Sequence, residues 1–316
     1  MDWSMEKTGT RCWQNHYGEY YTSKAEFDII LCDVCGFKHA IPLPSEADLE
    51  KFYSQHFYTA EKPAYFANYE EDLEWWNLTY QERYDLFEQF LSPHSARRLL
   101  DIGSGPGYFL LCGKKNGWKT FGIEPSEAAV QYSRKLGLNI TQAVFSEDIA
   151  QSAGQFDVVN LSEVLEHTPN PEQILNRVNS ILSPGGLLCV VVPNDCNVFQ
   201  LAVTELKICE PWWISPPQHL NYFTFDTLAQ LFNRCGFEVV FKTATFPIDM
   251  FLLMGDIYVG NDALGRACHT KRKTFEKNLL KAGVPHIKQT LYKKFAQMGI
   301  GREIQMIARK NDNEND

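Results

Sequence analysis

Short apolar runs alternate with amphipathic stretches through the middle of the chain. Apolar segments lead up to Asp101, Glu124 and Ser162, and each has the length and composition of a buried strand. Over Ile174–Leu182 the apolar positions follow a helical period, and Leu187–Val192 is a further apolar run. Strands that alternate with helices in this way predict an α/β fold with a doubly wound parallel sheet.

The pattern continues toward the C-terminus and then departs from a minimal sheet of this kind. It predicts a helix over Thr227–Cys235, an edge strand over Gly236–Ala244 and a final antiparallel strand over Arg302–Arg309. The long segment between the last two strands includes a predicted helix near Lys273–Met298. Because loops of this length usually form a functional unit or a subdomain, we expect a role in substrate specificity or oligomerisation.

These patterns divide the chain into five parts. They are an N-terminal segment (1–44), a helical lid or linker (45–95), a core (96–246 with 301–310), a helical insertion (247–300) and a tail (311–316). The tail is polar and is expected to be disordered.

The richest local pattern follows Asp101, where Gly103, Gly105 and Gly107 occupy alternate positions. Without side chains, their backbone N–H groups can approach a bound molecule closely, and the N-terminus of the following helix adds positive potential. A dinucleotide-binding loop has the spacing G-x-G-x-x-G, which would place its third glycine at Tyr108. The observed spacing therefore weighs against a nicotinamide-dependent oxidoreductase, which is the alternative enzyme class.

From about Leu99 to Asn194 the chain resembles the class I S-adenosylmethionine (SAM) methyltransferases. The D-x-G-x-G-x-G loop and the later phrases FDVV, EVLEH and LSPGG carry the resemblance to the ubiquinone-biosynthesis-like, small-molecule branch. It implies a seven-stranded Rossmann-like sheet, SAM as cofactor and methyl transfer to a small molecule. The phrase HLNYFT resembles the methyltransferases of polysaccharide clusters, which favours a hydroxyl of a sugar, sugar nucleotide or glycan intermediate as acceptor.

Candidate cofactor contacts lie in the glycine loop and at the ends of the neighbouring strands. Glu124 can accept hydrogen bonds from both hydroxyls of an adenosine ribose, as an acidic residue does in dinucleotide folds. A solvated carboxylate at a strand end is the alternative. The other predicted contacts are Asp101, Gly103, Gly105, Gly107, Tyr108, Pro125, Phe145, Ser162 and Glu163.

Methyl transfer to a hydroxyl requires removal of a proton, and two histidines are candidates for the general base. His167 follows the strand that ends at Ser162, and in a helical turn it would share a face with Glu163. His219 lies in a loop rich in tryptophan and proline, at the edge where open α/β sheets bind ligands. Structural roles for both histidines stay open, because EVLEH occurs with diverse acceptors and His219 can order its own loop.

A metal site is predicted near the N-terminus, where Cys32 and Cys35 form a C-x-x-C-G knuckle after a short apolar strand. The segment resembles the small zinc ribbon that precedes methyltransferase domains in surface-sugar and natural-product clusters. There a first C-x-x-C supplies two more ligands, but here its second cysteine is missing and His16 is the substitute. The predicted ligands of one structural zinc are therefore Cys12, His16, Cys32 and Cys35, with His39 as a weaker candidate for the fourth position.

The alternative to this zinc assignment is a ribbon that has lost its metal. The alternative to an enzyme is a metal-ribbon binding module whose SAM-binding core no longer transfers methyl groups.

Composition narrows the partners and the compartment. The chain is 44% hydrophobic, which supports a sizeable core, but no apolar run is long enough to span a bilayer. The first ten residues lack a signal-peptide pattern, and nine cysteines suggest reduced thiols rather than a disulfide framework. A net charge of −9 argues against broad nucleic-acid binding. We therefore expect a cytoplasmic enzyme with a small-molecule acceptor and an open oligomeric state, a homodimer included.

Overall fold

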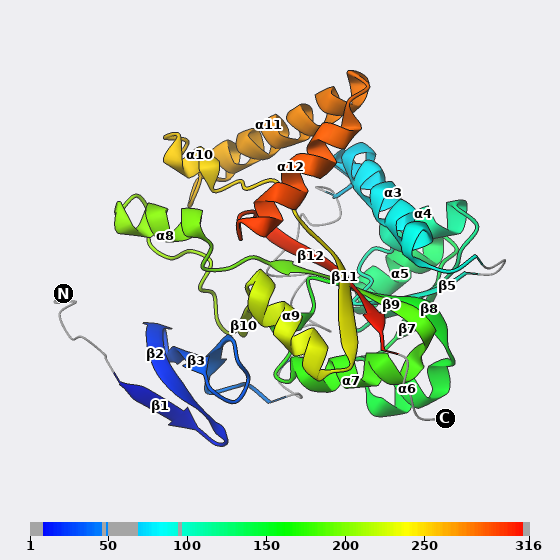
Figure 1. Cartoon of the computed structure of the whole chain (residues 1–316), viewed down its shortest axis with the longest axis horizontal. Helices are drawn as coiled ribbons and strands as arrows, with labels where there is room; N and C mark the ends of the chain where they lie inside the picture. The colour runs from blue at the N-terminus through cyan, green and yellow to red at the C-terminus, as the bar shows by residue number, and fades with distance from the viewer. Residues whose placement is uncertain (1–8, 46–48, 50–68, 94–96, 312–316) are drawn as a thin grey trace.

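A seven-stranded sheet forms the centre of the computed structural model, which describes residues 9–45, 49, 69–93 and 97–311 (Figure 1). In spatial order its strands are β11 (Phe237–Ala244), β12 (Glu303–Lys310), β9 (Leu182–Pro193), β8 (Phe156–Ser162), β5 (Arg98–Ile102), β6 (Lys119–Glu124) and β7 (Asn139–Gln142). Strand β12 runs antiparallel to both of its neighbours, and the other adjacent pairs are parallel. The predicted doubly wound α/β sheet is thus confirmed.

Successive residues of the central strands point to opposite sides of the sheet, so both faces present apolar side chains. Helices cover each of these faces. Leu99 of β5 packs in one core cluster and Leu100 in the other. The helices on the Leu99 side are α3 (Leu73–Phe90), α4 (Tyr108–Lys115) and α5 (Glu127–Lys135). Those on the Leu100 side are α6 (Glu147–Ala153), α7 (Pro171–Ile181) and α9 (Phe225–Arg234).

The insertion after β11 contains more than the single helix predicted near Lys273–Met298, and that prediction is wrong. The segment forms α10 (Met250–Leu253), α11 (Asp262–Lys281) and α12 (Pro285–Gln297). Gly283 has a φ of +73°, which ends α11, and Pro285 begins α12 in its first turn. These two residues are the local signal that divides the helical stretch.

A buried ionic network joins the insertion to α3. The carboxylate of Glu276 on α11 accepts hydrogen bonds from Trp75 Nε1 at 2.8 Å and from the Tyr292 hydroxyl at 2.7 Å. Burial opposes ionisation of Glu276, but the charges of Arg272 and Lys288 and the two hydrogen bonds together outweigh it and hold the pKa of this carboxyl below its usual range. The insertion therefore packs as a helical layer with α3.

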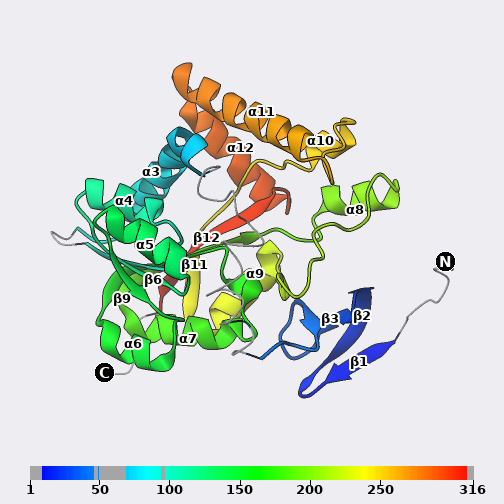
Figure 2. The same ribbon diagram turned by 180° about the vertical axis from the view of Figure 1, so that it is seen from behind.

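The N-terminal segment forms a second, five-stranded sheet that includes a strand from the core. Its order is β1 (Thr10–Trp13), β2 (His16–Lys24), β3 (Phe27–Cys32), β4 (Lys38–Ile41) and β10 (Asn221–Tyr222). Strand β10 pairs with β4, and Phe37 packs against Phe223 with ring centroids 4.9 Å apart. Figure 2 shows this ribbon at one end of the molecule, next to α9. Main-chain pairing and a shared core therefore tie the ribbon to the large sheet.

Among the described residues, no helix combines the length and the apolar character that a membrane span requires. The predicted disordered tail lies outside the described residues from 312 onward.

Candidate functional site

The glycine loop connects β5 to α4 at the carboxyl edge of the sheet. Gly103, Gly105 and Gly107 have φ angles of +73°, +50° and +79°, a region that residues with side chains rarely adopt. A Cβ atom on Gly103 would lie 2.7 Å from Val164 Cγ2, and one on Gly107 would lie 2.5 Å from Leu138 Cδ1. Backbone conformation and close packing therefore both explain the alternate glycines.

Glu124 fastens this loop to the end of β6. Its Oε2 atom accepts a hydrogen bond from the Gly105 N–H at 2.9 Å, and its Oε1 atom accepts one from the Ser126 N–H at 2.9 Å. The side chain is 4% exposed, so the alternative of a solvated carboxylate is wrong. Burial raises the pKa of Glu124, and the two backbone hydrogen bonds oppose that rise. Each oxygen keeps a further lone pair for a ligand hydroxyl.

Asp101 lies in β5 beneath the loop, within a buried polar chain. Asn160 Nδ2 donates to Asp101 Oδ1 at 2.6 Å, and Arg83 donates to Asn160 Oδ1 at 3.3 Å. Burial raises the pKa of Asp101 to about 7, although the hydrogen bond from Asn160 and the charge of Arg83 oppose it. Asp101 therefore supports the loop from below, and a direct contact with a cofactor stays a prediction.

The remaining predicted cofactor residues lie along the same edge of the sheet. Tyr108 begins α4, its hydroxyl is hydrogen-bonded to that of Tyr132, and its ring stacks on Tyr69 with centroids 5.2 Å apart. Ser162 ends β8, Glu163 follows it, Pro125 follows β6, and Phe145 is buried beyond β7.

The turn after β8 differs from the helical turn that would place Glu163 and His167 on one face. Glu163 has a φ of +56°, the left-handed region, and its N–H donates to Val191 O at 2.8 Å. A 3₁₀ helix begins only at Leu165 and ends at His167, so the predicted shared face is wrong. A residue held in the left-handed region at a strand end is a feature that clusters at functional sites.

Main-chain hydrogen bonds join this 3₁₀ turn to the loop that precedes β10. Leu220 N–H donates to Glu166 O at 2.7 Å. The side-chain amide of Asn221 donates to Leu165 O at 2.8 Å and to Thr168 O at 2.7 Å. Two segments about fifty positions apart in the sequence therefore form one rigid unit at the edge of the sheet. We call this unit, residues 165–168 with 218–221, the 3₁₀ corner.

This corner brings the two predicted histidines together. The rings of His167 and His219 meet edge to face with centroids 5.0 Å apart. His167 Nδ1 lies 2.6 Å from Gln218 O, and because a carbonyl oxygen only accepts, Nδ1 carries the proton. His167 Nε2 then faces Glu166 Oε1 at 3.5 Å.

Glu166 lies in the same turn, and it is not among the predicted catalytic or cofactor-binding residues. It is 0% exposed, and neither of its carboxylate oxygens has a hydrogen-bond partner among the described residues. Burial, with the neighbouring charge of Glu163, raises the pKa of Glu166 well above its usual range. The EVLEH phrase contains the residue, but its inward orientation follows only from the left-handed turn and the 3₁₀ helix.

A further buried acid, Asp195, lies just beyond β9 and also went unpredicted. It forms an ion pair with Arg302, whose guanidinium nitrogen is 3.7 Å from Asp195 Oδ1. Burial raises the pKa of Asp195 to about 7 in spite of this guanidinium. The negative charge of Asp195 also contributes to the raised pKa of Glu166, so buried acids gather at the ends of β8 and β9.

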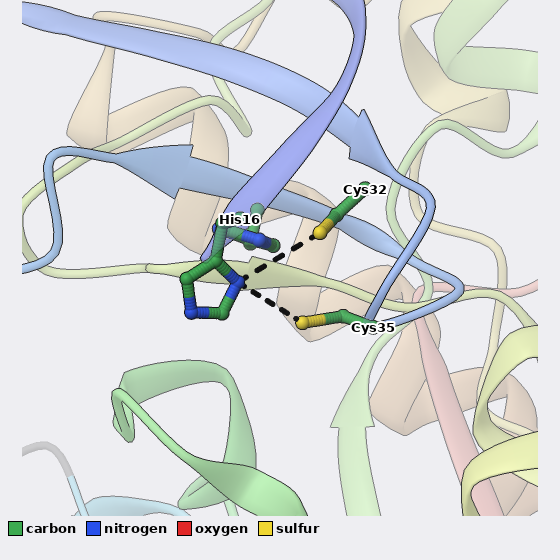
Figure 3. A group of neighbouring side chains, drawn as sticks. His16, Cys32 and Cys35 are labelled. Carbon is green, nitrogen blue, oxygen red and sulfur yellow. Dashed lines mark hydrogen bonds between the residues drawn. The ribbon is translucent and has the colours of Figure 1, made fainter. Parts of the chain in front are cut away.

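A second cluster of ligand-type side chains lies in the ribbon (Figure 3). His16 Nδ1 is 3.4 Å from Cys35 Sγ and 3.7 Å from Cys32 Sγ. The ring of His39 meets that of His16 edge to face at 4.7 Å, and one ligand atom from each of the four residues lies within 4.8 Å of the others.

Cys12 does not belong to this cluster, contrary to the predicted ligand set. In the β1–β2 hairpin Cys12 pairs with Tyr17, whereas His16 pairs with Trp13. Adjacent pairs of a hairpin point to opposite faces, so Cys12 and His16 lie on opposite sides. The thiol of Cys12 is exposed, and His39, the weaker candidate, completes the group of four.

His39 is oriented as a metal-binding histidine would be. It is 1% exposed, and its Nδ1 atom donates to Ala40 O at 2.9 Å. The lone pair is therefore on Nε2, which has no hydrogen-bond partner among the described residues.

Comparison with known proteins gives consistent results. A family model described as a methyltransferase domain matches residues 76–241, just over half of the 316 residues. A ubiquinone biosynthesis O-methyltransferase of Ruegeria pomeroyi is 29% identical over 155 residues, which cover 47% of this chain and 62% of that protein. The enzyme of the same description from Caulobacter sp. is 34% identical over 109 residues, or 33% and 43%. The chain thus spans less than two thirds of either relative.

The solved structure of a SAM-dependent methyltransferase from Archaeoglobus fulgidus shows the same fold. It covers 78% of this chain and 99% of its own, with a TM-score of 0.51 and 18% sequence identity.

The buried carboxyl beneath the glycine loop predicts a specific pH dependence of stability. The raised pKa of Asp101, about 7 against an ordinary 3.8, means that the folded protein keeps a proton that the unfolded chain has lost. Stability is therefore highest below the ordinary value and falls as the pH rises to about 7. In Asp101→Asn the amide oxygen still accepts from Asn160 but carries no charge, so this loss should disappear.

Urea unfolding of both proteins at several pH values measures the effect. The stability of the variant relative to wild type should increase with pH, by at most about 1.4 kcal/mol per unit within this window. Contributions from the other buried acids are common to both proteins and cancel. A difference that does not change with pH would contradict the assignment.

Proposed function

Because this chain belongs to the class I SAM-dependent methyltransferases, we propose that it transfers a methyl group from SAM to a hydroxyl of a small molecule. The observation that carries this proposal is that Val164, in the turn that leads to His167, packs against Gly103 of the glycine loop, while His219 meets His167 edge to face. Oxygen as the receiving atom is supported by the names of the curated relatives, which are O-methyltransferases. Resemblance of HLNYFT to polysaccharide-cluster enzymes supports a sugar, sugar nucleotide or glycan intermediate.

The glycine loop and Glu124 fit the donor. Backbone N–H groups in the left-handed loop are open to close approach, and the Glu124 oxygens can accept from two ribose hydroxyls. SAM supplies a methyl group bonded to a positively charged sulfur, and its transfer to a hydroxyl produces a methyl ether, S-adenosylhomocysteine and a proton. The loop holds the nucleoside so that donor and acceptor meet in line, which contributes roughly 7–11 kcal/mol in favourable cases.

The proton of the acceptor hydroxyl leaves at the 3₁₀ corner. His167 donates from Nδ1 to Gln218 O, so its Nε2 is the ring nitrogen with the lone pair, and it lies 3.5 Å from Glu166 Oε1. His219 reaches the same place from the loop before β10. We propose that this pair assists deprotonation, a contribution of about 10²–10⁴-fold for a well-placed general base.

The ribbon carries a structural zinc in this proposal, held by His16, Cys32, Cys35 and His39. In a tetrahedral zinc site the edge between a thiolate sulfur and an imidazole nitrogen is roughly 3.6 Å, from Zn–S and Zn–N bonds of about 2.3 and 2.05 Å. The His16 Nδ1 distances of 3.4 and 3.7 Å to the two sulfurs match that edge. The lone pair of the buried His39 Nε2 supplies the fourth ligand. The ion would hold β2, β3 and β4 together where they meet β10.

We propose that the core, residues 96–246 with 301–310, binds both the donor and the acceptor. The ribbon (1–44) and the insertion (247–300) support that core from outside. With SAM as donor, we propose a cytoplasmic enzyme.

Replacing Glu124 tests the donor site. Glu124→Ala removes the acceptor of two ribose hydroxyls and of the Gly105 N–H, so SAM binding in calorimetry should weaken by about 1–3 kcal/mol. Transfer of labelled methyl to a panel of sugar, sugar-nucleotide and phenolic hydroxyls should occur with the wild type and fall in the variant.

The matched control is Glu127→Ala, an exposed acid in the first turn of α5 that should leave SAM affinity unchanged. A folded Glu124→Ala protein that binds SAM as tightly as wild type would contradict the donor site. SAM binding without transfer to any acceptor would favour a binding module that has lost turnover.

Metal analysis tests the ribbon. The purified protein should contain about one zinc per chain, and both Cys32→Ser and His39→Ala should lower that content. Cys12→Ser is the control, because its exposed thiol lies on the opposite face and should leave the zinc content unchanged. A natively folded protein without zinc, or loss of zinc in Cys12→Ser alone, would end this assignment.

A further inference from the structure

We propose that the cavity between α3, the helical insertion and the strands β11 and β12 binds a small organic anion that carries hydroxyl groups. The acidic group of this ligand, a carboxylate or a phosphate, binds the guanidinium of Arg83. Of the described residues that line the cavity, none belongs to the glycine loop or to the 3₁₀ corner. The site is therefore separate from the donor site and from the two histidines, and ligand binding there does not rest on the proposed function.

The cavity has a volume of about 180 Å³ and extends along α3 from Trp75 to Gln89. Its other walls come from α11 and α12 of the insertion and from β11 and β12. A neighbouring hollow of about 260 Å³ shares Glu276 and Lys288 with it. Because one water molecule needs only a small part of this volume, the cavity has room for a small organic molecule.

Charged side chains form the buried wall of the cavity. Arg83, Arg272, Glu276 and Lys288 line it and are all buried. Three of them compensate one another, because Glu276 lies 3.4 Å from Arg272 and 3.5 Å from Lys288. Lys288 also pairs with Glu82 at 2.7 Å. Among the described residues, Arg83 forms no ion pair of this kind, so its charge is the one that a ligand can compensate.

Arg83 is the side chain that indicates an anionic ligand. It is 4% exposed, its Nη1 atom donates to Asn160 Oδ1 at 3.3 Å, and its guanidinium lies 5.1 Å from the centre of the Phe109 ring. Its Nε atom is buried and has no hydrogen-bond partner among the described residues. A buried donor without a partner is unfavourable, more so on a charged group. An arginine can donate two parallel hydrogen bonds to a carboxylate or a phosphate, and a ligand bound in this way would satisfy Nε.

Asp101 does not supply a full counter-charge to Arg83. The two side chains are linked through Asn160, whose Nδ2 atom donates to Asp101 Oδ1 at 2.6 Å. Burial raises the pKa of Asp101 to about 7 even with the charge of Arg83 nearby, so below neutral pH this carboxyl is largely protonated. A guanidinium stays charged throughout this range. The wall of the cavity therefore holds a cation without a matching anion.

The charges over the whole cavity also favour an anion. Its lining contains four basic side chains, the three buried ones and Lys293 at the exposed rim, against the three acids Glu82, Asp85 and Glu276. Because the other two bases are already paired, Arg83 and Lys293 remain to attract a ligand.

The uncharged lining groups suit a ligand with hydroxyls. Thr79 on α3, Thr243 on β11 and Gln305 on β12 all line the cavity. Hydroxyl and amide side chains both donate and accept hydrogen bonds, as the hydroxyls of a ligand require. Trp75 and Phe241 add ring surface on which a carbon skeleton can pack. We therefore expect a sugar acid or a sugar phosphate.

Calorimetric titration of the full chain tests the site with three probes: glucuronate, glucose 6-phosphate and, as the neutral control, glucose. At least one of the two anions should bind, with one molecule per chain, and glucose should bind at least roughly tenfold more weakly. The tighter of the two anions identifies whether a carboxylate or a phosphate is the preferred acidic group. Saturating S-adenosylhomocysteine should leave one anion bound per chain, because the donor site is separate.

Two variants locate the bound anion. Arg83→Lys keeps the charge but loses the paired donors of the guanidinium, so anion affinity should fall at least roughly tenfold. Lys293→Gln removes the exposed charge at the rim and should weaken binding about threefold. The matched control is Lys294→Gln, the neighbouring exposed lysine of α12, which is not in the lining and should bind the anion as wild type does.

The proposal is overturned if neither anion binds, if glucose binds as tightly as they do, or if anion affinity is unchanged in the variants that fold. Lys293→Gln, a surface change, keeps the test decisive if Arg83→Lys does not fold. Displacement of the anion by S-adenosylhomocysteine would place it in the donor site and would also refute the proposal. SAM affinity is measured on the same samples, so a failure of this site and a failure of the donor site are distinguishable.

Discussion

The pairing of the 3₁₀ turn with the loop before β10 is the contact on which the rest of the site depends. The hydrogen bond from Leu220 N–H to the main-chain Glu166 O places His219 beside His167. The same loop continues into β10, which adds to the ribbon sheet by pairing Asn221 with His39. One short strand therefore connects the candidate acceptor site to the candidate zinc site. Because any shift of the ribbon would move His219, we expect zinc binding in the ribbon to affect the candidate acceptor site.

The donor half of the site is organised differently, by local constraints. Three glycines in the left-handed region shape the loop, and the Glu124 carboxylate fastens it to β6 through Gly105. Close packing leaves no room for side chains at Gly103 and Gly107. Buried carboxyls with raised pKa values lie beneath and beside this loop, and Asp101 is one of them. Such groups reduce stability as the pH rises toward neutrality, and groups with shifted pKa values at the edge of the sheet are typical of functional positions.

The difference between these two halves, local constraints in one and long-range contacts in the other, explains what could be predicted from the sequence. The strand and helix order, the glycine loop and the position of Glu124 follow from short-range patterns, and the structure and the family match bear out the fold. The buried Glu166 depends on a left-handed residue and on a distant loop, which no local pattern encodes. The exclusion of Cys12 follows from hairpin register, because a shift by one residue changes the face of the sheet.

A crystal structure with S-adenosylhomocysteine bound tests the central claim most directly, namely that donor and acceptor meet between the glycine loop and the 3₁₀ corner. We expect the ribose hydroxyls to contact Glu124 and the sulfur atom to face His167 and His219. A sulfur atom directed instead toward Tyr108 and α3, away from the two histidines, would contradict it.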